Sequence, residues 1–302
     1  MHYFNNDRSL FRSLHGLVIA IACVVLMSGP RLLQAQDQAV KVEKGVHYLP
    51  DGRTELADLY LPGQWQEGKK YPGVLIIHGG GWTGGKRDAA REINIGTTLA
   101  SSGYVCMSID YKLQDVKATE LVWPTNLHDC KNAVRWMRAN ATRLHLDSER
   151  IGVIGGSAGG HLSAMVGITS SADGLDPRGY LDEFPCHVRC VVDLYGPSDV
   201  TQWKDVPALL KTRDEAPDLY RAFSVTTYLD KNDPPFLILH GTADTTVPVE
   251  QSTLLAEALK KAGVVHQLEI IEGAPHTFHL QPKQRDLRPL VIGFFDRHLK
   301  AN

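Results

Sequence analysis

The sequence predicts an α/β fold in which a mostly parallel central sheet carries helices on both faces. Two observations lead to this prediction: short apolar runs alternate with helix-forming segments, and glycine-rich turns directly follow two of those runs. Right-handed crossovers join strands and helices that alternate at this spacing, and they leave neighbouring strands parallel. The expected strands lie at residues 73–78, 105–109, 151–154, 191–195, 236–239 and 265–271, and the expected helices at 89–101, 126–144 and 251–262, with one more beginning after residue 157.

An antiparallel hairpin precedes the parallel part of the predicted sheet. Residues 42–60 alternate around Pro50-Asp51-Gly52-Arg53, which is a turn signal. One long interruption, residues 197–235, follows the sixth expected strand and is rich in charged and aromatic side chains. We expect this insertion to form a lid or a wall of a pocket.

The first 35 residues have the pattern of a secretory signal peptide. Arg8 and Arg12 precede an apolar block over residues 17–27, and small residues lead to Ala35. The block is short for a membrane span, so cleavage near Ala35 is favoured over an uncleaved anchor. We therefore expect a secreted or periplasmic protein with one domain over residues 36–302 and no stable membrane association.

Composition narrows the possible partners. A formal net charge of −2 and the lack of a basic cluster argue against nucleic acid, so a small-molecule or polysaccharide substrate fits better. No metal cluster, dinucleotide fingerprint or P-loop is present in the sequence, so no cofactor and no metal are expected. The sequence leaves the oligomeric state open.

Four cysteines follow the predicted cleavage site, and their pairing is left open. They are Cys106, Cys130, Cys186 and Cys190. For Cys186 and Cys190, a local disulfide or plain packing is favoured over a metal or redox pair, because the spacer is three residues and an apolar strand begins at Cys190.

The stretch 150–161 carries the strongest chemical signal in the chain. Gly155-Gly156-Ser157-Ala158-Gly159 fits G-x-S-x-G between an expected strand and an expected helix. In such a nucleophile elbow the serine is held in strained backbone angles, and the flanking glycines avoid clashes where strand and helix nearly touch. Ser157 is therefore the candidate nucleophile.

A serine nucleophile needs a base and an acid that orients this base. His276 follows the last expected strand, where open α/β sheets build their sites, and is the candidate base, with His279 as the competitor. Asp244 follows the preceding strand and is the candidate acid. Its competitor, Asp199, also follows a strand and has the alternative role of a turn or helix-cap residue.

The oxyanion hole is expected at His78-Gly79-Gly80-Gly81-Trp82, directly after the first parallel strand. Backbone N–H groups of Gly80 and Gly81, completed by that of Ala158, are the candidate donors. His78 is expected to orient this loop through a hydrogen bond. The alternative is a glycine-rich turn that only lets two loops pack.

These motifs resemble the α/β-hydrolase fold, and within it serine esterases and lipases with an HGGG loop, especially the bacterial feruloyl and acetyl-xylan esterase-like group. The matching blocks are residues 78–82, 108–111, 123–124, 129–136, 150–161, 195–199, 240–244 and 273–276. Lys112 after Tyr111 and Pro275 before the histidine depart from the group's pattern, which usually has arginine and glycine there, but neither touches the proposed chemistry.

The resemblance implies a serine carboxylesterase or carbohydrate esterase that acts through an acyl-enzyme and removes acetyl or feruloyl groups. An arylformamidase-like amidase or a peptidase on the same scaffold is the alternative within enzymes. A binding module derived from an inactive hydrolase is the alternative outside them, and it is disfavoured because all three triad residues are present. Fold resemblance alone leaves the acyl group and the sugar open.

Overall fold

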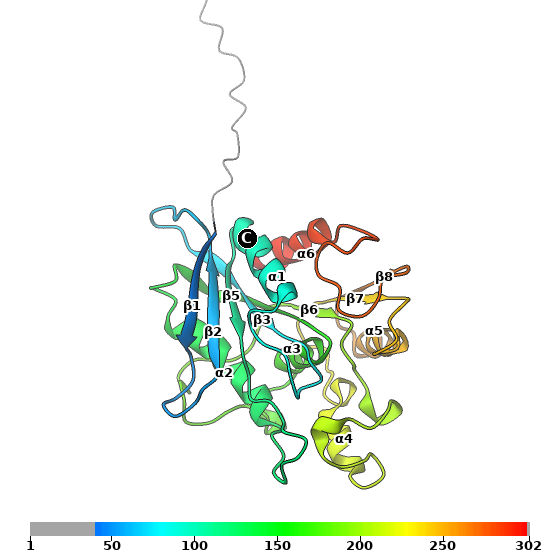
Figure 1. Cartoon of the computed structure of the whole chain (residues 1–302). Coiled ribbons are helices and arrows are strands. Elements are labelled where there is room, and N and C mark those ends of the chain that lie inside the picture. Colours follow the sequence, from blue (N-terminus) through cyan, green and yellow to red (C-terminus); the bar gives the residue numbers. More distant parts are fainter. Residues whose placement is uncertain (1–39, 301–302) are drawn as a thin grey trace, which may run out of the picture. The chain divides into compact units, whose positions relative to one another are not determined.

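The computed structural model describes residues 40–300, which build one eight-stranded sheet flanked by helices (Figure 1). The strands lie in the order β1-β2-β4-β3-β5-β6-β7-β8 across the sheet. Their bounds are β1 Lys41–His47, β2 Leu56–Leu61, β3 Tyr71–Ile77, β4 Val105–Ile109, β5 Leu146–Gly156, β6 Val191–Leu194, β7 Phe236–Gly241 and β8 His266–Ile271. This is the α/β-hydrolase fold that the sequence predicts.

The strand pairing confirms the predicted division of the sheet. β1 and β2 form the antiparallel hairpin, and β2 also runs antiparallel to β4. All the remaining neighbours, from β4 to β8, are parallel. Their carboxyl ends therefore meet along one edge of the sheet, which is where the loops of the candidate site begin.

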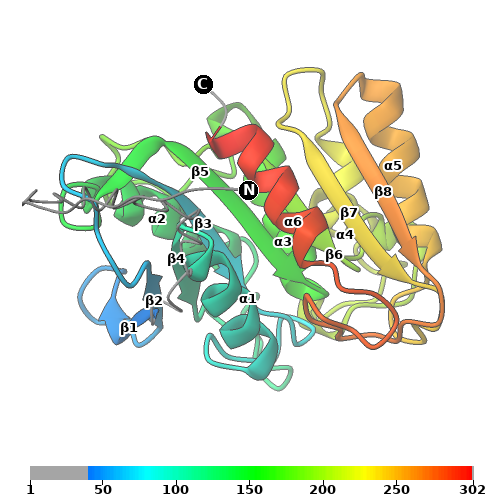
Figure 2. The same cartoon turned by 90° about the horizontal axis from the view of Figure 1, so that it is seen from above.

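Helices cover both faces of the sheet, as expected. Their bounds are α1 Ala90–Ser101, α2 Thr125–Ala139, α3 Ala158–Ile168, α4 Pro217–Phe223, α5 Glu250–Ala262 and α6 Arg288–Phe295. Figure 2 shows α1 and α6 in front of the strands, and one apolar cluster joins them to Val74 and Ile76 of β3. The alternate residues Leu75 and Ile77 belong to a second cluster with α2, α3 and α5. Burial on both faces explains why the parallel strands are continuous apolar runs.

Two details of the helices differ from the prediction. α2 ends at Ala139 and not at residue 144, because Asn140 donates a side-chain hydrogen bond to the carbonyl of Trp136 and the chain then turns. Leu144 is still fully buried in that turn, so the apolar periodicity outlasts the helix. α6, with the π-helical turn Asp296–Lys300 after it, was not predicted.

The insertion after β6 forms short helical turns. It contains the 3-10 turns Val200–Gln202, Pro207–Leu209 and Val225–Thr227, together with α4. A second irregular segment, residues 169–190, joins α3 to β6 and holds a further 3-10 turn at Ser171–Asp173. The sequence analysis does not predict this segment.

The four cysteines of the described residues are free thiols buried in the protein. Packing, rather than a disulfide, is therefore the role of Cys186 and Cys190. Burial raises the pKa of the Cys106 and Cys190 thiols well above their usual value.

The predicted signal peptide, residues 1–35, lies outside the described residues. Between residues 40 and 300, no helix has the length and the apolar character that crossing a membrane requires.

Close packing of α3 against β3 gives a first testable prediction. A Cβ on Gly159 of α3 would lie 2.1 Å from the carbonyl oxygen of Ile77, whereas a Cβ on Gly293 of α6 would meet nothing within 4 Å. We expect Gly159→Ala to lower the free energy of unfolding by about 2 kcal/mol or more, because backbone must move. Gly293→Ala, the control, should raise it by up to ~1 kcal/mol through helix propensity. Urea unfolding measures both, and equal stability of the two variants would contradict this account of α3.

Candidate active site

Ser157 occupies a sharp turn between β5 and α3. Its backbone angles are φ 58° and ψ −125°, which a residue with a side chain rarely adopts. The turn is so tight that a Cβ on Gly155 would lie 2.3 Å from the carbonyl oxygen of Gly159, so only glycine fits at this position. The N-terminus of α3 begins at the next residue, so its dipole favours negative charge at Ser157.

Ser157, His276 and Asp244 form a continuous row of hydrogen bonds. Oγ of Ser157 lies 2.9 Å from Nε2 of His276, and Nδ1 of His276 lies 2.6 Å from Oδ2 of Asp244. A carboxylate only accepts, so Nδ1 carries the proton and Nε2 is left to accept from the serine hydroxyl. The three residues follow β5, β7 and β8, at one edge of the sheet.

Two backbone donors and the ring of His240 hold Asp244 in place. Its side chain is only 1% exposed, and Oδ1 accepts hydrogen bonds from the backbone N–H groups of Thr246 and Val247 at 2.8 and 2.9 Å. Nε2 of His240 donates to the carbonyl of Val247 at 2.9 Å and lies 3.3 Å from Oδ2 of Asp244. Burial lowers the pKa of His240, so it supports the loop as a neutral ring.

The competing residues have other partners. Nδ1 of His279 accepts from the backbone N–H of Gln281. Asp199 caps the 3-10 turn Val200–Gln202 through a hydrogen bond from the N–H of Thr201, which is the alternative role that the sequence suggested. The structure therefore brings His276 and Asp244, not these two residues, to Ser157.

The HGGG loop lies beside the serine. Gly80 and Gly81 have φ of 119° and 61°, and both line one pocket with Ser157 and Ala158. Within residues 40–300, no loop, turn or cap hydrogen bond uses the N–H groups of Gly80, Gly81 or Ala158. These three donors therefore remain available to an oxyanion.

His78 holds the HGGG loop in place through a hydrogen bond, as expected. Nδ1 of His78 donates to the carbonyl of Gly79 at 2.7 Å, and the ring stacks on Tyr111 with centroids 4.3 Å apart. The hydroxyl of Tyr111 donates to the carbonyl of His78. Burial lowers the pKa of His78 to about 4, so this neutral histidine serves the loop and not proton transfer.

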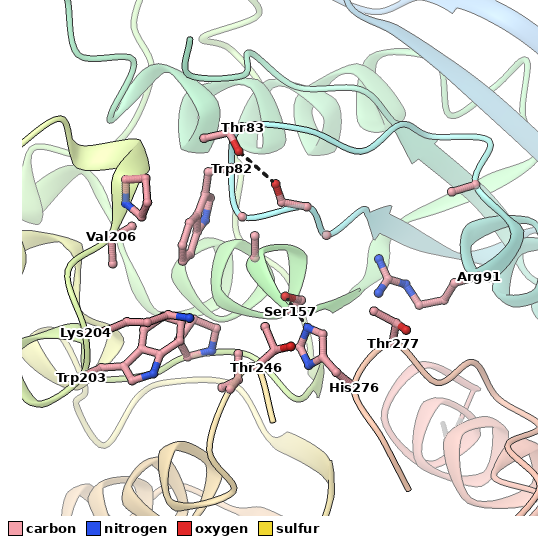
Figure 3. A pocket seen from close by; sticks show the side chains of 18 of the residues that line it. Trp82, Thr83, Arg91, Ser157, Trp203, Lys204, Val206, Thr246, His276 and Thr277 are labelled. Atoms are coloured by element: carbon pink, nitrogen blue, oxygen red, sulfur yellow. Dashed lines mark hydrogen bonds between the residues drawn. The ribbon is translucent and has the colours of Figure 1, made fainter. Parts of the chain in front are cut away.

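The triad opens into a pocket of about 610 Å³ (Figure 3). The insertion forms one wall, as predicted, and contributes Trp203, Val206 and Pro207. Trp82 lines it from the loop after β3 and Arg91 from the first turn of α1, and neither is identified as a site residue from the sequence. Trp82 follows the three glycines directly, which is a signal that could have identified it; Arg91 carries no comparable signal. The other lining residues are Gly79, Gly80, Gly81, Thr83, Ala89, Glu92, Ala158, Pro197, Lys204, Asp205, Thr246, Val247 and Thr277.

Comparison with known families agrees with this geometry. Residues 57–259, which include the HGGG loop, the elbow and Asp244, match the BD-FAE family. The chain belongs to the BD-FAE family. His276 lies beyond the matched residues of this BD-FAE chain, so its assignment depends on the geometry above.

Three proteins similar to the BD-FAE chain are described as esterases. Esterase LipC of Mycobacterium tuberculosis is 35% identical over 232 residues, 70% of this chain and 54% of that protein. A structure described as a truncated carbohydrate esterase from gut microbiota aligns with a TM-score of 0.77 and 28% identity, covering 88% of this chain and 99% of that one. Esterase 2 of Thermogutta terrifontis, phosphorylated by paraoxon, aligns with a TM-score of 0.70 and 26% identity, covering 88% and 98%. The chain spans about half the length of the first curated relatives that it matches.

The triad geometry predicts that Ser157 and His276 act as one unit. We expect Ser157→Ala and His276→Ala each to lower kcat on p-nitrophenyl acetate by about 10³-fold or more, and the double variant to be little worse than either. His279→Ala is the matched control and should keep kcat within about threefold, because its side chain contacts a backbone N–H away from Ser157. Steady-state kinetics test this, and a larger loss in His279→Ala than in His276→Ala would reject His276 as the base.

The two aspartates give a second prediction for the site. Asp244→Asn should lower kcat by about 10⁴-fold with the fold retained, because an amide favours the wrong tautomer of His276. Asp199→Asn should change turnover and stability little, because asparagine caps a helical turn about as well as aspartate does. Kinetics and melting curves of both variants distinguish these outcomes. A larger loss of kcat in Asp199→Asn, at an unchanged melting temperature, would contradict the assignment of Asp244.

Proposed function

We propose that this protein is a serine carboxylesterase that removes acetyl or feruloyl groups from carbohydrate. The observation that carries the proposal is the hydrogen-bonded row Ser157–His276–Asp244, which opens into a pocket beside three free backbone N–H donors. This arrangement supplies a nucleophile, a base, an orienting acid and an oxyanion hole, which together are what ester hydrolysis requires.

The first half of the reaction forms an acyl-enzyme. Oγ of Ser157 attacks the ester carbonyl carbon while Nε2 of His276 takes the hydroxyl proton, and Asp244 stabilises the imidazolium through its Nδ1–H. The N–H groups of Gly80, Gly81 and Ala158 receive the negative charge on the carbonyl oxygen. The tetrahedral intermediate then breaks its bond to the leaving alcohol, which takes the proton from Nε2.

The second half reverses these roles with water. Nε2 of His276 removes a proton from water, and the resulting hydroxide attacks the acyl carbon of the serine ester. When the second tetrahedral intermediate collapses, Oγ of Ser157 leaves with the proton and the carboxylic acid is released.

The pocket supports a substrate larger than a simple acetyl ester. Trp82 and Trp203 face the space in front of Ser157 in Figure 3, and flat apolar side chains of this kind contact sugar rings or aromatic acyl groups. Its volume of about 610 Å³ exceeds what an acetyl group needs. The carbohydrate esterase among the structural relatives also supports this substrate class.

Export is part of the proposal. The signal peptide pattern of residues 1–35 supports a secreted or periplasmic enzyme. Outside the cytoplasm, such an enzyme has access to acylated polysaccharides. An arylformamidase-like amidase or a peptidase on the same scaffold remains the second candidate, because the same triad also attacks amides.

A substrate panel tests the proposal. We expect hydrolysis of acetylated xylo-oligosaccharides or feruloylated arabino-oligosaccharides with a higher kcat/KM than p-nitrophenyl acetate, because the aromatic walls contact only the larger substrates. Ser157→Ala is the control for spontaneous hydrolysis, and paraoxon should add one phosphoryl group to wild type and none to Ser157→Ala in intact mass spectra. Faster turnover of an aryl formamide or a peptide anilide than of every ester would favour the second candidate.

A further inference from the structure

Arg91 lines the pocket, yet ester hydrolysis as described above gives it no role. Its side chain is 12% exposed and comes from the first turn of α1. In Figure 3 the guanidinium points from the side opposite Trp203 toward Ser157 and Thr277. Nε and Nη2 donate to Oε1 of Glu92 at 2.8 and 2.5 Å, so the charge of Arg91 is already balanced.

The guanidinium lies against both loops that surround the serine. A Cβ on Gly156 of the elbow would lie 2.7 Å from Nη1 of Arg91. A Cβ on Gly79 of the HGGG loop would lie 3.0 Å from Nη2 of Arg91 and 3.1 Å from Cβ of Ser157. The absence of side chains at these two glycines is therefore what lets the guanidinium approach the nucleophile.

Tyr195 connects Arg91 to the loop of His276. Nη1 of Arg91 donates to the hydroxyl of Tyr195 at 3.1 Å, and this hydroxyl donates to the carbonyl of Phe278 at 2.6 Å. The ring of Tyr195 packs edge-on against His276, with centroids 4.9 Å apart, and against Phe278 at 4.5 Å. Arg91 of α1 is thus linked to the loop after β8 through Tyr195, which follows β6.

The loop of His276 needs such support. Thr277, the next residue, has φ 66°, which is unfavourable for a β-branched side chain, and Tyr195 itself has φ 46°. Strained backbone persists only where surrounding contacts hold it. In the described residues, the Tyr195 hydroxyl is the one side-chain group that bonds the backbone of residues 275–279.

We propose that Arg91 and Tyr195 are positioning residues, which hold the His276 loop so that Nε2 stays within hydrogen-bond distance of Ser157. The inference rests on the proposed ester hydrolysis for its kinetic test but is independent of the acyl group and the sugar. A misplacement of a catalytic group by about 1 Å lowers turnover by up to ~10²-fold. Support for the loop therefore acts on kcat.

The protonation of Tyr195 fits this role. Burial raises its pKa to about 12, with the nearby charge of Arg91 opposing the rise, so the phenol is protonated at neutral pH. A protonated hydroxyl accepts from Arg91 and donates to Phe278 at the same time.

Tyr195→Phe removes only the hydroxyl and leaves the ring against His276. We expect kcat on p-nitrophenyl acetate to fall about 10- to 100-fold with KM within about twofold, because the residue contacts no substrate. Tyr48→Phe is the matched control: Tyr48 is also fully buried, donates to the carbonyl of Asp110 and lies outside the pocket lining. It should lower the melting temperature comparably and leave kcat unchanged. Equal kcat in Tyr195→Phe and Tyr48→Phe would overturn the proposal.

Arg91→Lys keeps the positive charge but removes the guanidinium, whose N–H groups donate to Glu92 and Tyr195 at the same time. We expect a loss of kcat similar to that of Tyr195→Phe, and a double variant no worse than the worse single variant, because both act through one chain of contacts. If the kcat of the double variant falls by the product of the two single losses, Arg91 and Tyr195 act independently, which would contradict the proposed chain of contacts. A raised KM with unchanged kcat would instead make Arg91 a substrate contact and overturn the proposal.

A proton resonance supplies a test that needs no substrate. The Nδ1–H of His276 in its bond to Asp244 should give a downfield signal in a ¹H NMR spectrum, which Asp244→Asn removes. Tyr195→Phe should shift or broaden this signal and Tyr48→Phe should not. If wild type hydrolyses no ester, the proposed function fails while this spectrum still decides on the positioning role: an unchanged signal in Tyr195→Phe would overturn it.

Discussion

The site depends on one close contact between β3 and α3. A Cβ on Gly159 would lie 2.1 Å from the carbonyl of Ile77, the last residue of β3, and 2.6 Å from that of His78. Ile77 also pairs with Gly155 in the sheet, so the strand that ends in the HGGG loop lies directly beside the strand that ends in the elbow. This single contact brings the two halves of the oxyanion hole together and keeps Ser157 in its strained turn.

The parallel sheet determines where the other groups meet. β7 and β8 pair in register, so the loops that carry Asp244 and His276 leave the sheet next to each other. β6 lies between β5 and β7, and the insertion that follows it therefore extends over the space in front of Ser157. Residues more than 100 positions apart, such as Ser157 and His276, reach hydrogen-bond distance because their strands have fixed neighbours.

The elements that could be predicted from the sequence are those whose conformation is determined by residues close together in the chain. The elbow, the HGGG loop and the apolar strands are each defined by a few consecutive residues, and the strands lie where those residues predict, except that β5 begins at Leu146, before the apolar run at 151–154. The choice between Asp244 and Asp199 was harder, since each follows a strand; strand order decides it, because β7 and not β6 is adjacent to β8. Arg91 could not be identified in this way, since its partner Tyr195 is 104 residues away in the chain. The end of α2 was missed because a turn keeps the same apolar spacing as the helix before it.

The buried thiols have a consequence for how this protein responds to its surroundings. The residues from 40 to 300 hold their four cysteines as free thiols inside the core, so no covalent link between them contributes to the stability of the fold. Thiols react mainly as thiolates, and burial disfavours the thiolate at Cys106, Cys130 and Cys190. Within residues 40–300, these buried thiols are therefore protected from oxidants while the sheet is closed, and they become reactive when the core opens. Labelling of these four cysteines with a thiol reagent consequently reports opening of the core, with no need to introduce a reporter residue by mutation.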